Sequence, residues 1–216
     1  SFASFNGTAG NLVAVPGYSA AAVTAGIAYG TEASGIRAST PAEFSNRDAF
    51  IFTDGSGNNR YPIRAATDGA AVATPLSQAE VRAVLEEAFT VMSRARAQIR
   101  KPLDSRAQVT ITVVDTFGTP LGMVRSPDAP IFGSDVSLQK ARTAAFFSGA
   151  QAGTELSANT SADIRQFVAA TRAFLNNSAA LTGTIAFSDR ANGNLSRPYF
   201  PDGEVGRPQG PLSRPI

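Results

Sequence analysis

The sequence predicts a mixed α/β domain of the α+β type, in which helices pack against an antiparallel sheet, with an irregular N-terminal arm and C-terminal tail. Three observations support this fold class: a capped amphipathic helix pattern, a pair of strands joined by a turn, and two further helix patterns downstream. The chain has 216 residues, 43% of them hydrophobic, so it can bury a core without disulfides. We expect an arm with a β-hairpin at 1–75, the main domain at 76–187 and a Gly- and Pro-rich tail at 188–216.

The clearest element is a helix predicted over 78–100. Ser77 and Glu80 match the S-x-x-E capping box that starts a helix. Pro102 predicts that the helix ends before it. Apolar residues repeat at helical spacing and are expected to form one core stripe: Val81, Val84, Leu85, Ala88, Val91, Met92, Ala95 and Ile99.

A β-hairpin is predicted next, with strands over 109–114 and 121–125 joined by a turn that begins at Asp115. Gly122 inside the second strand indicates either a β-bulge or the close approach of another group.

An earlier hairpin is predicted within the N-terminal part. Residues 49–52 are apolar and aromatic, residues 54–59 are turn formers, and residues 60–63 are expected to return as an edge strand, where Pro62 is tolerated. The Gly- and Ala-rich segment at 1–35 is expected to be an arm.

Two helices are predicted after the main hairpin. One runs over 134–148 with Ser134 as its N-cap, and the other over 162–175 with Thr160 and Asp163 as a capping pair. A short strand is expected over 181–187, and from residue 188 the chain shows no regular pattern.

The absence of histidine and cysteine limits the chemistry of the chain. It removes the commonest general base, the thiol nucleophile and two common metal ligands, so no catalytic residue and no metal site is assigned. The 19 cationic and 17 acidic residues are scattered, so we expect no nucleic-acid binding. No apolar run predicts a membrane span. A soluble protein is expected, with a periplasmic or secreted location favoured over the cytoplasm.

One stretch resembles a known family. It contains the strand ending Val113-Val114-Asp115, the partner strand at 121–125 and the helix motif Lys140-Ala141-Arg142-Thr143-Ala144. Together they resemble the GlcG/HbpS-like haem-binding family, which is also found as the C-terminal domain of corrinoid adenosyltransferases. The resemblance covers 76–148 and implies an antiparallel sheet with packed helices, frequent homo-oligomers, and ligands such as haem or cobalamin. Haem cannot have a histidine or cysteine ligand from this chain, so the cofactor stays open.

The same resemblance implies that the helix carrying Lys140 lines the ligand region. Lys140 and Arg142 would hold an anionic group such as a propionate, or one of them would pair with a carboxylate at a subunit interface. Asp115 and Arg125 are expected either to meet across the hairpin or to leave Asp115 bonded to its own turn. The full set of candidate ligand-binding residues is Asp115, Arg125, Phe132, Asp135, Lys140, Arg142, Thr143 and Phe147.

These observations favour a non-enzymatic module that binds a tetrapyrrole-like or anionic small molecule. The alternatives are a structural or assembly subunit, and an enzyme subunit that uses Arg, Lys and Asp alone. Residues 29–64 and 188–198 resemble parts of longer, duplicated family members, so the chain is expected to be a piece of a larger precursor. The expected partner is a second copy or a companion fragment, packed on both ends of the chain.

Overall fold

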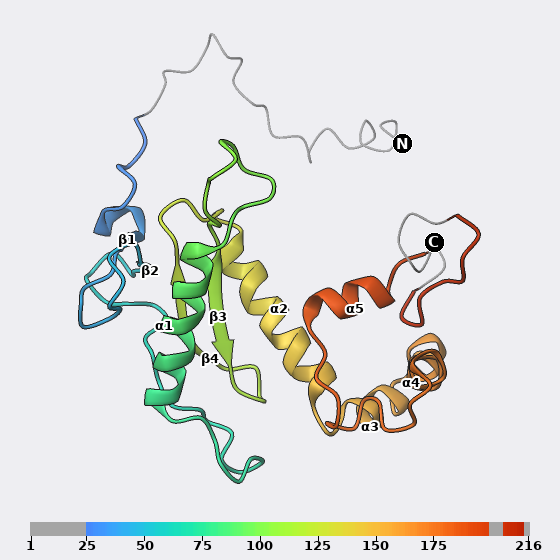
Figure 1. Cartoon of the computed structure of the whole chain (residues 1–216). Helices are drawn as coiled ribbons and strands as arrows, with labels where there is room; N and C mark the ends of the chain where they lie inside the picture. Colours follow the sequence, from blue (N-terminus) through green and yellow to red (C-terminus); the bar gives the residue numbers. More distant parts are fainter. Residues whose placement is uncertain (1–24, 199–204, 214–216) are drawn as a thin grey trace, which may run out of the picture.

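The computed structural model describes residues 25–198 and 205–213, which form a four-stranded antiparallel sheet and a helical unit joined to it by one long helix (Figure 1). The α+β fold class is therefore confirmed. The strands are β1 (Ile36–Ala38), β2 (Phe50–Phe52), β3 (Thr110–Val114) and β4 (Pro120–Arg125), in the order β1-β2-β4-β3.

The predicted main hairpin is present as β3 and β4, but the predicted earlier hairpin is wrong in its second strand. Strand β2 pairs with the upstream strand β1, and residues 60–63 form no strand. A bridge between Thr53 and Asn59 is the only ladder contact of the loop. Pro62 has no N–H to continue pairing, and the chain turns away so that the Arg64 N–H can donate to the Leu121 carbonyl at 2.9 Å.

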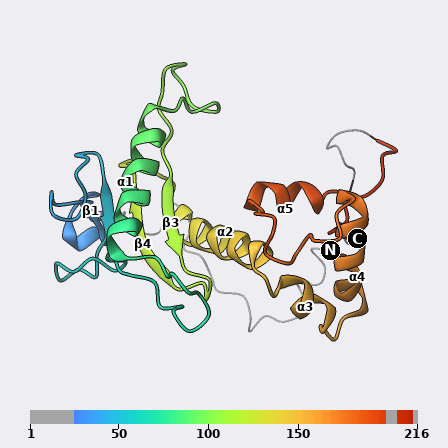
Figure 2. The ribbon, with the colours of Figure 1, turned by 60° about the horizontal axis from the view of Figure 1, so that its bottom comes forward.

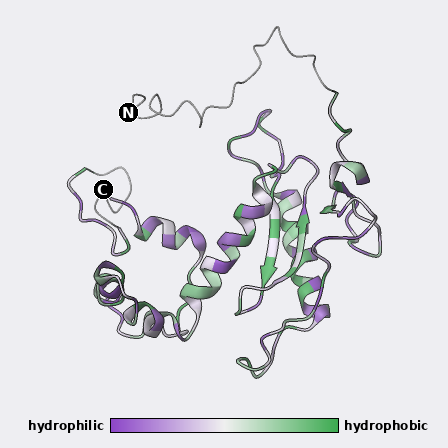
Figure 3. Cartoon of the chain, turned by 180° about the vertical axis from the view of Figure 1, so that it is seen from behind, coloured by the Kyte–Doolittle hydropathy of each residue, from purple (hydrophilic) through white to green (hydrophobic). Residues whose placement is uncertain are grey.

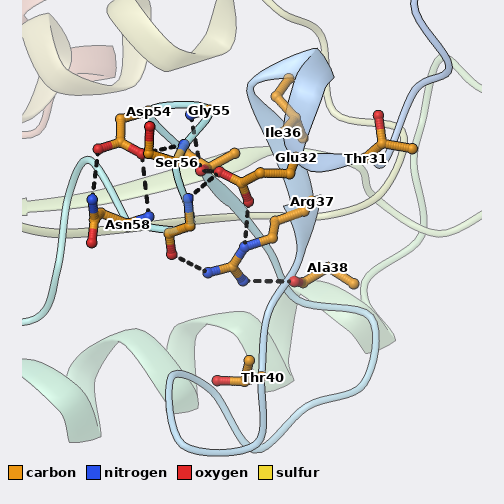
Figure 4. Close-up of polar contacts among 12 residues, drawn as sticks. Thr31, Glu32, Ile36, Arg37, Ala38, Thr40, Asp54, Gly55, Ser56 and Asn58 are labelled. Carbon is orange, nitrogen blue, oxygen red and sulfur yellow. Dashed lines mark hydrogen bonds and ion pairs between the residues drawn. The ribbon is translucent and has the colours of Figure 1, made fainter.

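Polar contacts hold the β1–β2 unit together (Figure 4). Arg37 on β1 forms ion pairs with Glu32 at 3.1 Å and with Glu43 at 2.9 Å. The hydrogen bonds from Arg37 hold the pKa of the Glu43 carboxyl below its usual value. The Glu32 carboxylate also accepts a hydrogen bond from the Gly57 N–H, so the short strands are tied to the loop that follows β2.

Strand β4 separates two apolar clusters because the successive side chains Met123 and Val124 point to opposite faces of the sheet. Val124 faces helix α1 (Gln78–Arg94) in the larger cluster, whereas Met123 faces helix α2 (Gly133–Ser148) and Leu138 in the smaller one. In Figure 3 the hairpin strands are coloured mostly as hydrophobic, whereas hydrophobic and hydrophilic residues alternate along α2. The buried members of the larger cluster are Phe44, Ala49, Ile51, Ile63, Val81, Leu85, Phe89, Met92, Leu121 and Val124.

Helix α1 starts at the predicted capping box, which is fully formed, but ends at Arg94 rather than near residue 100. Ala95 is already extended, and the following loop is closed by an Arg96–Arg106 bridge. The predicted core stripe is correct only in part. Ile99 in the loop is 95% exposed, and a narrower face of α1 is buried.

Helices α3 (Ala152–Ser157), α4 (Ala162–Leu175) and α5 (Asp189–Leu195) form the second unit, at the end of α2 away from the sheet (Figures 1 and 2). Their shared cluster contains the buried residues Ala152, Val168, Leu181, Phe187 and Leu195, with Leu212 packed against it. Helix α5 and Leu212 of the predicted tail therefore pack on this chain's own helices, whereas Val205 is 87% exposed.

Several local predictions in this unit are wrong. Residues 181–187 form turns instead of a strand, because the Leu181 backbone is left-handed and its carbonyl accepts from Gly153. The predicted caps Ser134 and Thr160 do not cap: α2 begins after Phe132 and α4 after Ser161. Helix α5 was not expected at all.

Gly122 shows both features that were predicted as alternatives, a β-bulge and the close approach of another group. A register irregularity lies beside it, since Val113 pairs with Gly122 but Val114 pairs with Pro120. A Cβ atom at Gly122 would also lie 2.7 Å from Leu85 Cδ1, so α1 approaches the strand closely there.

We predict that Gly122→Ala lowers the free energy of unfolding by about 1–3 kcal/mol, because the fully buried Leu85 has no room to retreat. Chemical denaturation measures this change. Adding Leu85→Ala should make the two effects less than additive. Gly69→Ala, where the new Cβ meets only an ordinary contact at 3.8 Å, is the control. Full additivity of the pair would contradict the close approach.

Candidate functional site

A pocket of about 380 Å³ lies beside α2, between it, α4, α5 and the C-terminal segment. Its volume falls within the range of small-molecule sites. Eight residues line it: Thr143 and Phe147 from α2, Phe167 from α4, Asp189, Asn192 and Gly193 from α5, and Ser196 and Leu212 beyond α5.

Asn192 is the most unusual residue of this pocket. It is only 6% exposed, and neither its amide oxygen nor its amide nitrogen has a hydrogen-bond partner among the described residues. Helix α5 is fixed in place by its N-cap, because the Ser188 hydroxyl accepts from the Ala191 N–H at 3.1 Å. A buried amide without partners is costly, so its place beside a pocket calls for an explanation.

The remaining lining supplies apolar walls and a neutral rim. Phe147 meets Phe146 edge-to-face at 5.2 Å, which fixes the ring that forms part of the wall. Lys140 and Asp189 form an ion pair at 3.4 Å between α2 and α5. Because both side chains are partly exposed, this pair adds little stability, but it leaves the rim without net charge.

Three of the predicted site residues share this side of α2, as their spacing requires: Lys140, Thr143 and Phe147. Arg142 lies on a different side, where its Nε donates to the Gly118 carbonyl at 2.9 Å. Lys140 and Arg142 therefore do not converge on one anion. The carboxylate that pairs with Lys140 belongs to the same chain.

Asp115 and Arg125 lie at opposite ends of the hairpin. Asp115 sits beside the turn, where its backbone N–H donates to Thr119, whereas Arg125 pairs with Thr110 at the far end. The expectation that the two charges meet is therefore wrong, and the alternative of a turn aspartate is correct.

Asp115 forms half of a reciprocal clasp. Its carboxylate accepts from the Thr67 N–H at 3.0 Å and the Thr67 hydroxyl at 2.7 Å, while Asp68 accepts from the same two groups of Thr116. Burial opposes ionisation of Asp115, but the hydrogen bonds from Thr67, Thr119 and Phe117 outweigh it and hold the pKa below its usual value. The clasp joins the segment before α1 to the hairpin turn.

Arg125 is fully buried on the face of the sheet opposite α1. Its guanidinium lies 5.7 Å from the Tyr29 ring centre and 5.5 Å from that of Phe52, and it donates to the Tyr29 hydroxyl and the Ala129 carbonyl. No carboxylate among the described residues pairs with it, and its Nε has no partner there. Aromatic faces and oxygen acceptors therefore stabilise this cation.

The last two predicted residues lie away from the pocket. Phe132 occupies the N-cap position of α2 and is 69% exposed. Asp135 is exposed in the first turn of α2 and accepts a hydrogen bond from Gln139.

Sequence reasoning missed the residues that α4, α5 and the C-terminal segment bring to the pocket. A signal for α5 existed, since Ser188 followed by Asp189 is typical of a helix start. Gly193 in the middle of the segment concealed it, because glycine disfavours helix.

Comparison with known families gives the class of protein. Residues 84–190 match the model of the HbpS-like family, described as haem degrading protein HbpS-like. Residues 84–190 therefore form an HbpS-like region, which confirms the resemblance seen in the sequence. No curated protein and no solved structure matches the chain.

No described helix is long and apolar enough to cross a membrane. Within residues 25–198 and 205–213, no group of three or more potential acidic, histidine or cysteine ligands lies together.

The Asp115 clasp predicts a pH-dependent stability. The usual aspartate pKa is near 3.8 and the folded-state pKa is lower, so the stabilisation is complete above the usual value and is lost as the pH falls through the folded-state value. Asp115→Asn should lower the free energy of unfolding at neutral pH by about 1–3 kcal/mol and flatten its loss in acid. Denaturation at a series of pH values measures both, with the exposed Asp104→Asn as control. An unchanged pH profile would refute the assignment.

The orphaned amide predicts a variant that is more stable than the natural protein. Asn192→Leu should raise the free energy of unfolding by about 1–2 kcal/mol, because it removes a buried amide that has no partner within residues 25–198 and 205–213. Asn194→Leu on the same helix shares the gain in helix propensity but not the buried position, so it is the matched control. If Asn192→Leu is less stable than wild type, the amide is already satisfied.

Proposed function

We propose that this chain is a small-molecule-binding module whose ligand occupies the pocket between α2, α4 and α5. The observation that carries the proposal is the Asn192 amide, which is buried at the pocket and has no hydrogen-bond partner for its donor or its acceptor among the described residues. A ligand that supplies those two hydrogen bonds would remove the cost of leaving them unmade. The match of residues 84–190 to the HbpS-like family supports a ligand-binding role at the level of the family.

The lining favours a particular ligand chemistry. A carboxamide pairs best with a group that presents a donor and an acceptor side by side, such as a lactam, another amide or a protonated carboxyl. Phe147 and Phe167 favour a planar, apolar body. Since Lys140 and Asp189 neutralise each other at the rim, the pocket suits a neutral ligand better than the anionic one that the sequence suggested.

Haem, which the description of the family names, does not fit this pocket as an iron-bound group. None of the eight lining residues carries an imidazole, thiolate, thioether or phenol. The phenols of Tyr29 and Tyr61 lie in the sheet unit, against Phe50 and Phe52. The proposal therefore involves no step at iron.

A planar lactam tests the proposal directly. We expect 2-quinolinone to bind the wild-type protein, as measured by ligand-observed NMR titration. Gly193→Leu places a side chain into open space at the pocket and should weaken binding by at least roughly tenfold, or about 1.4 kcal/mol. Asn192→Leu should do the same by removing the hydrogen bonds.

Two controls make the titration specific. Gly26→Leu adds the same side chain in open space on the N-terminal arm and should leave binding unchanged. Naphthalene has a similar ring system without the lactam edge and should discriminate little between wild type and Asn192→Leu. Equal lactam binding by wild type, Gly193→Leu and Asn192→Leu would place the ligand elsewhere and reject the pocket.

A further inference from the structure

Helix α1 has a second apolar face that does not contribute to the core. Val84, Ala88, Val91 and Ala95 follow one another at intervals of four, three and four residues, and we call them the α1 seam. Val84 is 49% exposed and Val91 59% exposed. The seam forms one side of an open groove of about 850 Å³, which is also lined by Ala107 on the segment leading to the edge strand β3.

This spacing is that of a helix-pairing seam. Alternating intervals of four and three residues keep one stripe on one side of a helix, where it can pack along a partner helix. The core face of α1 is already occupied by Val81, Leu85, Phe89 and Met92. An uncovered seam beside a complete core face indicates that a second helix packs there.

The order of residue sizes selects the partner. Along the seam large and small residues alternate: Val84, Ala88, Val91, Ala95. A second α1 laid antiparallel about a two-fold axis places Val84 opposite Ala95 and Ala88 opposite Val91. Every layer then combines one large residue with one small residue, so the two helices interdigitate. The seam is therefore complementary to itself, as a symmetric dimer interface must be.

The flanking charges favour the same arrangement. Glu87 and Arg94 border the seam, are exposed, and have no ion-pair partner among the described residues. In the antiparallel pair, Glu87 of each copy approaches Arg94 of the other, twice per dimer. In a parallel pair the flank that carries Glu87 and Arg94 would face the opposite flank of the partner, so these two charges would not meet.

We propose that a second copy of this chain docks antiparallel on the α1 seam to form a two-fold symmetric dimer. This inference is independent of the small-molecule pocket, which involves α2, α4 and α5. The dimer covers the groove and extends the core past Ala107.

Sedimentation of the full chain at concentrations on the order of 100 μM tests the dimer, since even a weak interface is populated there. Val91→Glu should raise the dissociation constant by at least about tenfold, because it buries a charge in the seam. Ile131→Glu is the matched control: Ile131 is 60% exposed, in the loop that leads into α2, and its change should leave the dimer intact. Because Val91 is exposed, circular dichroism should show both variants folded.

Charge exchange tests the direction of the helices. Glu87→Arg alone should weaken the dimer roughly fivefold by opposing two arginines, and adding Arg94→Glu should restore it. The natural chain has no cysteine, so oxidation of an equal mixture of Ala88→Cys and Val91→Cys proteins reports only on these positions. An antiparallel seam favours the mixed cross-link, and a parallel one favours the two homodimers.

Three results would overturn the proposal. They are a wild-type protein that stays monomeric throughout, a dimer that Val91→Glu does not weaken, and a cross-linking pattern dominated by homodimers.

Discussion

The alternation of side chains along β4 is the constraint on which the rest of the structure depends. One step of the strand points Val124 at α1, and the next points Arg125 at the aromatic rings of Tyr29 and Phe52. A shift by one residue would put the guanidinium against the core of α1, so the register is strongly determined. Since α2 follows directly from this strand, the same register sets where α2 leaves the sheet and where the helical unit is placed.

Local sequence signals correctly predicted the helices and strands that depend on residues close together in the chain. The capping box at Ser77 and Glu80, the helix over 162–175 and the hairpin before Arg125 depend on residues near one another in the chain. The errors occurred where a distant contact determines the backbone. Residues 60–63 do not pair back on β2 because Leu121 offers Arg64 a partner, and residues 181–187 turn because Gly153 bonds to Leu181.

For the same reason, the sequence predicted the α2 side of the candidate site but not the α5 side. Helical periodicity placed Lys140, Thr143 and Phe147 on one side of α2. No periodicity could show that Asn192 would lie against that side, since α5 is reached only through the turns after α4. Arg125 illustrates the opposite case. The sequence marked it as a charge of interest, but its aromatic surroundings come from Tyr29 and Phe52, far upstream.

The sheet combines strands from both sides of α1 in the sequence: β1 and β2 precede the helix, and β3 and β4 follow it. The family match begins at residue 84, yet β2 pairs with β4, and Tyr29 and Phe52 cover the buried Arg125. Without the upstream strands, β4 would become an edge strand of the sheet. The Arg125 guanidinium would then lose the rings of Tyr29 and Phe52 and face water. The residues upstream of the matched region are thus part of the folding unit, and they close one edge of the sheet. Its other edge, β3, is the one beside which the α1 seam remains uncovered.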